Sequence, residues 1–302
     1  MKPSLRTLIK ARPLAGKTVA VSGATGGIGQ PLCEQLIALG ASLILLDRNT
    51  EKSCALARRL GEQYPHCSVR HIRVDLEDLE TVRGAIDALR DTALDALILN
   101  AGAYSIPRHT CQTGYDNVFQ INFIAPYLLA SGLLPTIRSR GGKIVAVGSI
   151  AHRYSVTDPK DVDFSTRARA SLVYGNAKRY LMASLPALGR EISIVHPGIT
   201  FTNITAHYPP LIFALIKYPM KVIFMPPRKA SLCIIRGLFE DLGSTEWIGP
   251  RFFDVWGAPK RKRLRSIKDA EREAICRRTE KIMERIEQDA KDAGDAGDAV
   301  AF

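Results

Sequence analysis

Residues 22–30 read SGATGGIGQ and follow the apolar run KTVAVS. Gly23, Gly27 and Gly29 fall where a strand would pass into a helix, and Pro31 suits the first helical turn because its missing N–H costs nothing there. Glycine permits the backbone angles of such a turn and lets a diphosphate approach the main chain. The following helix offers unpaired N–H groups and the positive end of its dipole to an anion. Taken alone this is a tight turn, but its place at the first strand–helix junction indicates a dinucleotide site.

The rest of the chain alternates between short apolar runs and stretches with helical spacing. The runs are continuously apolar, as expected of strands that are covered on both faces. Strand, helix, strand in sequence predicts right-handed crossovers. We therefore expect an α/β fold, a Rossmann-type doubly wound parallel sheet in a single domain. The expected strands are residues 17–22, 42–47, 69–74, 95–100, 143–149 and 192–196, and helical spacing occurs at 31–40 and 117–134.

No segment rich in proline, glycine or serine interrupts the chain before residue 258, so we expect one Rossmann domain over residues 15–258. A basic N-terminal arm, residues 1–14, precedes it. Residues 259–302 are expected to form a basic helical C-terminal extension, opened by KRKRLR at 260–265 and ending in a frayed tail. No nucleic acid partner is expected, because aromatic residues are not interleaved with this basic run and acidic residues soon follow.

The composition is that of a soluble globular protein of 302 residues, with 46% hydrophobic residues and a mean hydropathy of −0.02. The formal net charge of +12 suggests attraction to anionic ligands or surfaces. Six scattered cysteines without a C-x-x-C pair favour a reducing compartment and argue against disulfides or a structural zinc. The basic leader has no continuous apolar segment, which favours a solvated arm over an organelle transit peptide. We expect a cytoplasmic protein without a metal.

The predicted second strand ends at Asp47, which is followed by Arg48. In such folds an acid at this position accepts hydrogen bonds from the adenosine ribose hydroxyls and repels a 2′-phosphate, which favours NAD(H). Arg48 is a counter-signal, because an arginine can pair with that phosphate. NADP(H) therefore stays open as the cofactor, and a simple turn role stays open for Asp47.

Further side chains capable of chemistry follow the fourth and fifth predicted strands. The tripeptide 100–102 (NAG) ends strand four and Ser149 ends strand five, at the edge where open α/β sheets bind ligands. In YGNAK, Tyr174 and Lys178 are four residues apart, a spacing that stacks two side chains on one helix face. Each residue taken singly could be an ordinary cap or surface residue. Together, beside a predicted dinucleotide, they indicate a reaction centre.

In their order and spacing these motifs resemble those of the short-chain dehydrogenase/reductase family, over roughly residues 15–255. The long gap between Ser149 and Tyr174 and the apolar segment after HPG resemble the branch of retinol and hydroxysteroid dehydrogenases. The chain departs from the family pattern at Ser22, Leu99 and Ala177 without losing a catalytic group. The motifs that carry the resemblance are SGATGGIG, Asp75-Leu76, Asn100-Ala101-Gly102, Asn122, Ser149, YGNAK and HPG at 196–198.

The resemblance implies a mechanism. Tyr174 would act as general acid/base toward an alcohol or carbonyl oxygen. A free phenol has a pKa of about 10, too high for this role near neutrality, and the Lys178 ammonium with the charged nicotinamide would lower it. Ser149 would hydrogen-bond the substrate oxygen, and Asn122 would hold a water that links Lys178 to solvent. The cofactor-binding residues that the resemblance implies are Gly23, Thr25, Gly27, Ile28, Gly29, Asp47, Arg48, Asp75, Leu76, Asn100, Ala101, Gly102, Tyr174, Lys178, Pro197, Gly198, Thr200 and Thr202.

Residues 203–228, rich in proline and large apolar side chains, correspond to a substrate lid in the family that the chain resembles. Such a lid implies a bulky hydrophobic substrate, for example a steroid, a retinoid or a long-chain carbonyl compound. Two alternatives stay open: core packing, or shallow contact with a membrane surface by a peripheral protein. The side chains with that interfacial composition are Phe213, Lys217, Lys221, Phe224, Met225, Arg228 and Lys229.

The expected function is therefore NAD(P)-dependent oxidoreduction of a hydrophobic alcohol or carbonyl compound. The alternatives are a catalytically idle dinucleotide-binding scaffold and a membrane-surface lipid-handling protein. Retention of Tyr174 and Lys178 favours the enzyme. The resemblance also implies a homodimer paired through the helices that contain Asn122 and Tyr174, which the basic C-terminal extension could alter.

Overall fold

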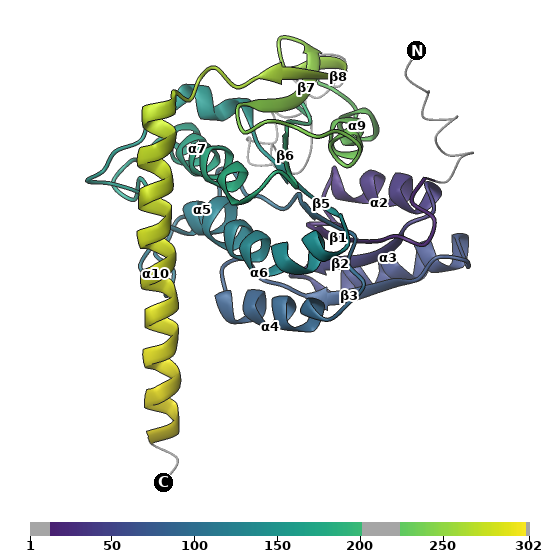
Figure 1. Cartoon of the computed structure of the whole chain (residues 1–302), viewed down its shortest axis with the longest axis horizontal. Helices are drawn as coiled ribbons and strands as arrows, with labels where there is room; N and C mark the ends of the chain where they lie inside the picture. The colour runs from purple at the N-terminus through teal and green to yellow at the C-terminus, as the bar shows by residue number, and fades with distance from the viewer. Residues whose placement is uncertain (1–12, 201–223, 300–302) are drawn as a thin grey trace, which may run out of the picture.

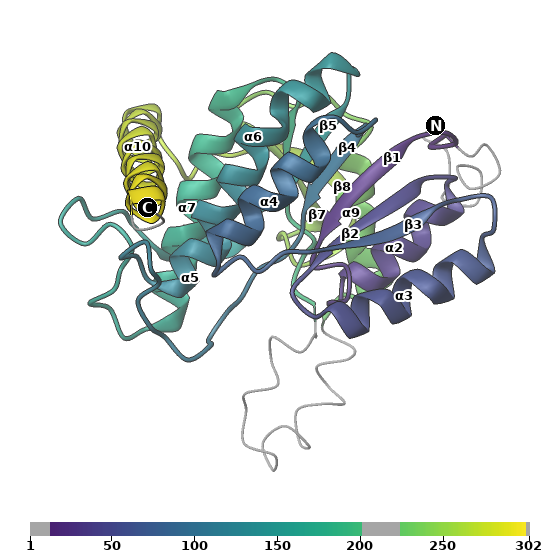
Figure 2. The same ribbon diagram turned by 90° about the horizontal axis from the view of Figure 1, so that it is seen from below.

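The computed structural model describes residues 13–200 and 224–299, with side chains described as far as residue 292. These residues form an eight-stranded sheet in the order β3-β2-β1-β4-β5-β6-β7-β8, with helices on both faces (Figures 1 and 2). Neighbours from β3 to β7 pair in parallel, and β8 pairs antiparallel with β7. The strands are β1 (Thr18–Ser22), β2 (Ser42–Asp47), β3 (Val69–Arg73), β4 (Ala96–Leu99), β5 (Lys143–Val147), β6 (Ile192–Val195), β7 (Glu246–Phe252) and β8 (Trp256–Arg263).

Helices form a layer on each face of the sheet (Figure 2). One layer holds α2 (Gly29–Ala38), α3 (Thr50–Gln63) and α9 (Pro227–Gly237), and the other holds α4 (Leu79–Arg90), α6 (Ala125–Ser139) and α7 (Ala170–Leu188). The remaining elements are α5 (Asn117–Phe119), the π-helix η1 (Gln120–Ile124), the 3-10 helix η2 (Ile150–Tyr154) and α10 (Asp269–Ala299).

The apolar strands supply the core on both faces of the sheet. In β1, Ala20 packs into the cluster under α4, α6 and α7, whereas Val19 and Val21 pack into the cluster under α2 and α9. A strand covered on both sides has no polar face, which explains the continuous apolar runs in the sequence. The predicted doubly wound α/β fold and its six expected strands are confirmed; β7 and β8 were not predicted.

The start of the C-terminal segment differs from the prediction. KRKRLR was expected to open a helix, and this was wrong, because residues 256–263 form β8 on the edge of the sheet. Charged side chains are typical of edge strands, where they discourage pairing with other chains, and here Arg261 pairs with Glu246 of β7. The helix begins only at Asp269. It continues to Ala299, through most of the tail expected to fray, and the expected boundary at residue 258 falls inside β8.

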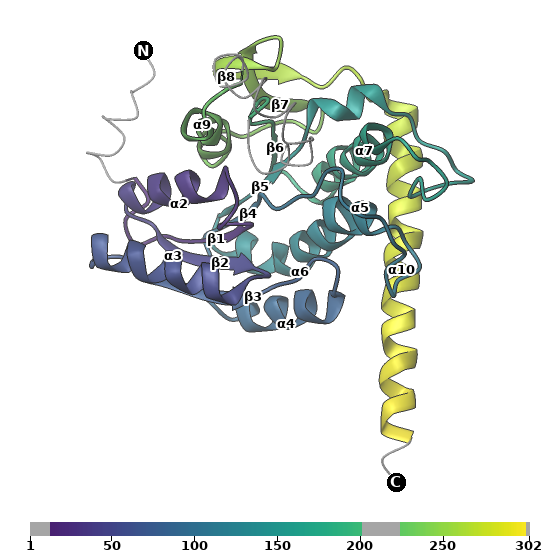
Figure 3. The same ribbon diagram turned by 180° about the vertical axis from the view of Figure 1, so that it is seen from behind.

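Helix α10 lies against α7, and its C-terminal end extends past the rest of the domain (Figures 1 and 3). Ile275, Ile282 and Ile286 recur at helical spacing and are buried in the same cluster as α6 and α7. This apolar face joins the C-terminal helix to the main core.

One helical run among the described residues, Asn117–Ser139, is long and apolar enough to cross a membrane. It comprises α5, η1 and α6, and 72% of its most apolar window is buried inside the protein. Such burial is typical of a core helix in a soluble domain, so this run carries no argument for a membrane span.

Candidate active site

The glycine turn is folded tightly between β1 and α2. Gly23 has a φ of +66°, and a Cβ on it would lie 2.9 Å from the Cα of Ala101. A Cβ on Gly29 would lie 2.0 Å from the carbonyl oxygen of Gly23, so the turn requires glycine at both positions. The Asn100 side chain donates to the carbonyl oxygens of Ser22 (3.1 Å) and Gly23 (3.0 Å), which ties the end of β4 to the turn.

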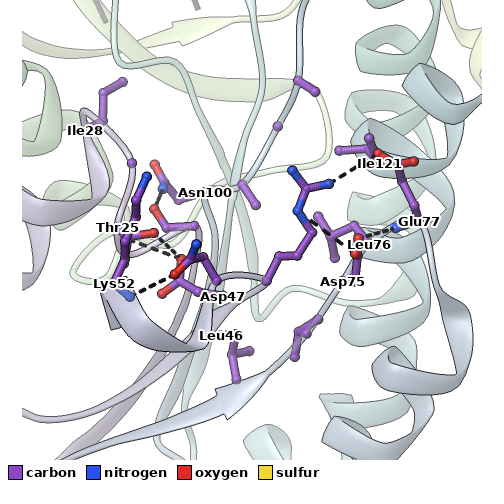
Figure 4. A pocket seen from close by; sticks show the side chains of 18 of the residues that line it. Thr25, Ile28, Leu46, Asp47, Lys52, Asp75, Leu76, Glu77, Asn100 and Ile121 are labelled. Atoms are coloured by element: carbon purple, nitrogen blue, oxygen red, sulfur yellow. Dashed lines mark hydrogen bonds and ion pairs between the residues drawn. The ribbon is translucent and has the colours of Figure 1, made fainter. Parts of the chain in front are cut away.

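A cavity of about 450 Å³ opens beside this turn, at the carboxyl ends of β1, β2 and β4 (Figure 4). Many of the predicted cofactor residues line it: Gly23, Thr25, Gly27, Ile28, Asp47, Arg48, Asp75, Leu76, Asn100, Ala101 and Gly102. Sequence reasoning missed Gly26, Leu46, Asn49, Lys52, Val74, Glu77, Ala103, Ile106 and Ile121, which also line it. Gly26 belongs to the glycine-turn motif itself, whereas the others carry no motif and are brought to the cavity by the fold.

Both carboxylate oxygens of Asp47 accept hydrogen bonds from neighbouring residues of the protein. Its Oδ1 accepts hydrogen bonds from the backbone N–H (3.2 Å) and the hydroxyl (3.0 Å) of Thr25, and its Oδ2 accepts from the Ser53 hydroxyl (3.0 Å; Figure 4 shows Thr25 and Asp47). The residue is only 5% exposed. The carboxylate thus fastens the glycine turn to α3. Arg48, by contrast, has a 68% exposed side chain at the cavity, where it lies 3.6 Å from the Glu77 carboxylate and 4.0 Å from the Asp75 carboxylate.

Ser149, Tyr174 and Lys178 come together at the carboxyl end of β5. Ser149 caps η2, and its side chain hydrogen-bonds the Tyr174 hydroxyl. The Lys178 ammonium lies 5.7 Å from the centroid of the Tyr174 ring and donates to the carbonyl oxygen of Val147 at 2.9 Å. Tyr104 packs edge-on against Tyr174, with ring centroids 5.3 Å apart. A serine, a phenol and a buried lysine therefore form one connected group.

Asn122 joins this group from η1. Its Oδ1 accepts from the Ala103 N–H (3.2 Å), and its Nδ2 donates to the carbonyl oxygens of Ala103 and Val118 (2.8 Å each). A π-helical turn breaks the regular backbone pairing, and such turns occur often at functional sites. A Cβ on Gly102 would lie 2.8 Å from Asn122 Oδ1 and 3.6 Å from Lys178 Nζ. The absence of a Cβ at Gly102 therefore leaves room for the Asn122 side chain, beside the Lys178 ammonium.

Burial shifts the pKa values of Tyr174 and Lys178, which both lie in α7. It raises the pKa of Tyr174 to about 12, although the hydrogen bond from Ser149 acts in the opposite direction. It lowers the pKa of Lys178 to about 7. The expected lowering of the Tyr174 pKa by Lys178 and the nicotinamide concerns the cofactor complex and stays a prediction.

The depressed pKa of Lys178 predicts a pH-dependent stability. Below about pH 7 this lysine is charged in both folded and unfolded chains, and the whole cost of burying the charge is present. Between about pH 7 and its ordinary value of 10.5, the unfolded chain binds more protons, so stability rises with pH. We expect Lys178→Met to be more stable than wild type at acid pH, with the advantage shrinking by about 1.4 kcal/mol per pH unit above neutrality. Urea unfolding across this range measures it.

The matched control for this prediction is Lys268→Met, which removes an exposed lysine. Its difference from wild type should stay flat with pH. A flat difference for Lys178→Met as well would contradict the burial of a charged amine at this position.

A second network, which sequence reasoning missed, holds the Ser149 turn in place. His152 Nδ1 donates to the Ser149 carbonyl oxygen, and its Nε2 accepts from the Ser266 hydroxyl. Burial lowers the pKa of His152 to about 4, so the ring is neutral, as these two bonds require. Arg179 donates to the carbonyl oxygens of His152 (2.8 Å) and Ser266 (2.7 Å) and forms a two-bonded ion pair with Glu271 of α10. No local pattern identifies contacts that span up to 114 residues.

The remaining predicted residues follow β6. Gly198 has a φ of +89°, and a Cβ there would lie 2.8 Å from the carbonyl oxygen of Val255. Pro197 is buried and Thr200 is half-buried. Thr202 and most of the expected lid, including Phe213, Lys217 and Lys221, lie outside the described residues.

Three potential metal ligands also gather near the cavity. Atoms of Glu77, His109 and Cys111 lie within 4.8 Å of one another. His109 Nε2 pairs with Glu77 at 3.0 Å, and the Asn117 amide nitrogen lies 3.1 Å from His109 Nδ1. Burial raises the pKa of the Cys111 thiol to about 11, which opposes the thiolate that a metal binds. The contacts with Glu77 and Asn117 hold the His109 ring in this cluster.

The fold and these side chains form a candidate dinucleotide site in an α/β domain, and three comparisons identify the relatives of the chain. The family described as short chain dehydrogenase matches residues 17–159. An uncharacterized oxidoreductase of Schizosaccharomyces pombe is 28% identical over 90% of this chain and 86% of that protein. Human retinol dehydrogenase 13 is 30% identical over 64% of this chain and 62% of that protein. A solved structure from Mycobacterium paratuberculosis, an uncharacterized protein, has a TM-score of 0.68 at 23% identity and covers 90% of this chain and 94% of its own.

The chain is similar to the short-chain dehydrogenase/reductase family, the family that its motifs resemble. The similarity to retinol dehydrogenases 13 and 14 supports the resemblance to that branch. The aligned chain spans less than two thirds of the length of these retinol dehydrogenases, and 54% of a short chain dehydrogenase of Aspergillus nomiae.

Proposed function

We propose that this protein is an NAD(P)-dependent oxidoreductase that interconverts a hydrophobic alcohol and its ketone or aldehyde. The observation that carries the proposal is the connected group of Ser149, Tyr174 and Lys178 beside the glycine-turn cavity. A phenol hydrogen-bonded to serine and backed by a lysine can exchange a proton with an oxygen that gains or loses charge. The similarity to the short-chain dehydrogenase/reductase family supports this proposal.

The cavity suits a dinucleotide. From Gly23 to Ile28 the turn lines it largely with main chain, and α2 begins directly behind, where helix N–H groups favour a phosphate. A bound nicotinamide would donate the hydride in carbonyl reduction or accept it in alcohol oxidation, chemistry that no protein side chain provides. Lys178 would hold the adjoining ribose hydroxyls and, when protonated, stabilise the Tyr174 phenolate. The water-linked relay through Asn122 stays a prediction.

For the choice of nucleotide, the geometry supports NADP(H) better than the expected NAD(H). Both Asp47 oxygens already accept hydrogen bonds, and the residue is buried, so it is poorly placed to receive ribose hydroxyls. Arg48 and Lys52 instead present cationic groups at the cavity. An arginine with five donors suits a 2′-phosphate.

The substrate class rests on apolar surroundings. Ile199, next to the half-buried Thr200, is 36% exposed, and Met225 returns to it through a backbone hydrogen bond of 2.9 Å. The intervening sequence is rich in leucine, isoleucine and phenylalanine. The names of retinol dehydrogenases 13 and 14 also favour a hydrophobic alcohol.

The test is turnover of retinoid, steroid and long-chain aliphatic carbonyl compounds with NADPH and with NADH. We expect turnover of at least one of them with NADPH. Arg48→Ser should raise the KM for NADPH about tenfold, the loss of one charge-assisted hydrogen bond, and leave the KM for NADH nearly unchanged. Arg59→Ser, an exposed arginine of α3 outside the cavity lining, is the control. Nucleotide binding without any turnover would instead support the idle scaffold, and a preference for NADH would restore the role expected of Asp47.

A further inference from the structure

The tip of the β7–β8 hairpin exposes two adjacent phenylalanines. Because β7 runs parallel to β6, it ends at the carboxyl edge of the sheet, the edge that holds Ser149. Phe252 is 54% exposed and Phe253 is 89% exposed. Adjacent large apolar side chains in an exposed turn are unfavourable in water, and such apolar surface often marks an interaction site.

The tip is held in a strained conformation that turns Phe253 outward. Phe253 and Asp254 have φ values of +49° and +60°, a region that residues other than glycine rarely adopt. The buried Asp254 carboxylate accepts from Lys262 (2.6 Å) and Arg153 (2.9 Å), which fixes the turn from inside. Strain maintained by a buried ion-pair network is a reason to seek a function for the side chain it presents.

Other exposed apolar side chains lie at the same edge. The Arg153–Asp254 ion pair brings the end of η2 to the hairpin tip, and the next residues there include Tyr154 (64% exposed) and Val156 (68% exposed). Gly198, which follows β6 at this edge, lies against the carbonyl oxygen of Val255 in the tip. The apolar surface therefore lies at the sheet edge that holds the catalytic group.

Cationic side chains accompany this surface. The Arg251 guanidinium lies over the Phe252 ring at 5.6 Å, and the exposed Lys229 ammonium lies over Trp256, the strand partner of Phe252, at 5.4 Å. The acidic residue within the tip, Asp254, is buried and already paired with two cations. Exposed aromatic residues next to lysine and arginine match the interfacial region of an anionic membrane.

We propose that this hairpin-tip surface (Tyr154, Val156, Lys229, Arg251, Phe252 and Phe253) docks on an anionic lipid bilayer and turns the carboxyl edge of the sheet, with its catalytic group, toward it. A hydrophobic substrate could then pass from the membrane into the site without crossing water. That last step rests on the proposed function. Docking itself does not, because it requires neither cofactor nor turnover.

The experiment is co-sedimentation of the full chain with vesicles of phosphatidylcholine alone and of phosphatidylcholine with phosphatidylserine, without nucleotide or substrate. We expect binding to the phosphatidylserine vesicles that weakens as salt is raised. Phe252→Ser with Phe253→Ser should weaken it at least about tenfold, because two aromatic rings no longer enter the interface. Phe239→Ser is the matched control, since Phe239 is 46% exposed beyond the end of α9, at the opposite edge of the sheet.

The role of the cationic side chains is tested with the double variant Lys229→Glu and Arg251→Glu, which should lose the preference for phosphatidylserine vesicles. Arg58→Glu with Arg190→Glu makes the same charge change at exposed positions outside the surface and should retain most of the binding. Undiminished vesicle binding by the double serine variant, or no binding by wild type, would overturn the proposal. A dimer of wild type that this variant loses, without any vesicle binding, would assign the surface to a protein partner instead. Far-ultraviolet circular dichroism verifies that each variant is folded.

Discussion

Replacing Tyr174 by phenylalanine should lower kcat by about a thousandfold, in the range expected when a general acid/base is removed. The ring would keep its packing against Tyr104, so only the hydroxyl and its hydrogen bond to Ser149 are lost. NADPH should bind with nearly unchanged affinity, because the glycine turn and Arg48 are untouched. Nucleotide fluorescence titration and steady-state kinetics on the same samples separate the two effects.

The matched control is Tyr127→Phe, which removes a half-buried hydroxyl from α6, outside the residues that line the cavity. Its kcat should stay within about twofold of wild type, as for most substitutions away from a site. Full activity in Tyr174→Phe would refute the assigned mechanism. Strong NADPH binding with no turnover in wild type would show an idle scaffold whose catalytic residues are retained.

The fold was predictable because its signals are local. A strand buried on both faces must be apolar, and a turn with a Cβ position 2.0 Å from a carbonyl oxygen must contain glycine, as at Gly29. β8 was missed for the opposite reason. It is an edge strand whose lysines and arginines are exposed, so its sequence has no apolar run, and its pairing with β7 is a contact that the local sequence does not indicate. The helix expected to open at KRKRLR was predicted from the charged helical pattern of the C-terminal segment, which in the structure begins only at Asp269.

The sequence indicated which residues gather at the candidate site, but it could not indicate which neighbouring side chains they contact. The spacing of Tyr174 and Lys178 placed them on one helix face, where they lie. Asp47 shows the limit, because its role depends on Thr25 and Ser53, which approach it from the turn and from α3. The sequence alone does not distinguish an acidic residue that binds a ribose from one that is hydrogen-bonded by neighbouring protein groups.

Arg179→Met should lower the free energy of unfolding by about 3 kcal/mol, the cost of breaking a buried ion pair by removing one partner. The Arg179 side chain is 8% exposed and Glu271 is 24% exposed, and the same guanidinium also satisfies the carbonyl oxygens of His152 and Ser266. Urea unfolding should show a lower midpoint with an unchanged slope. Arg59→Met, which breaks an exposed pair with Glu34, should change stability by less than about 1 kcal/mol.

A double-mutant cycle with Glu271→Gln assigns the loss to the pair. The double variant should lose less than the sum of the single variants, because each alone leaves a charged partner unsatisfied. Since Arg179 and His152 also hold the Ser149 turn against the start of α10, Arg179→Met should lower kcat as well, while NADPH affinity is retained. Additive stability losses would mean that Arg179 and Glu271 are not energetically coupled. An unchanged kcat would mean that this network does not position Ser149.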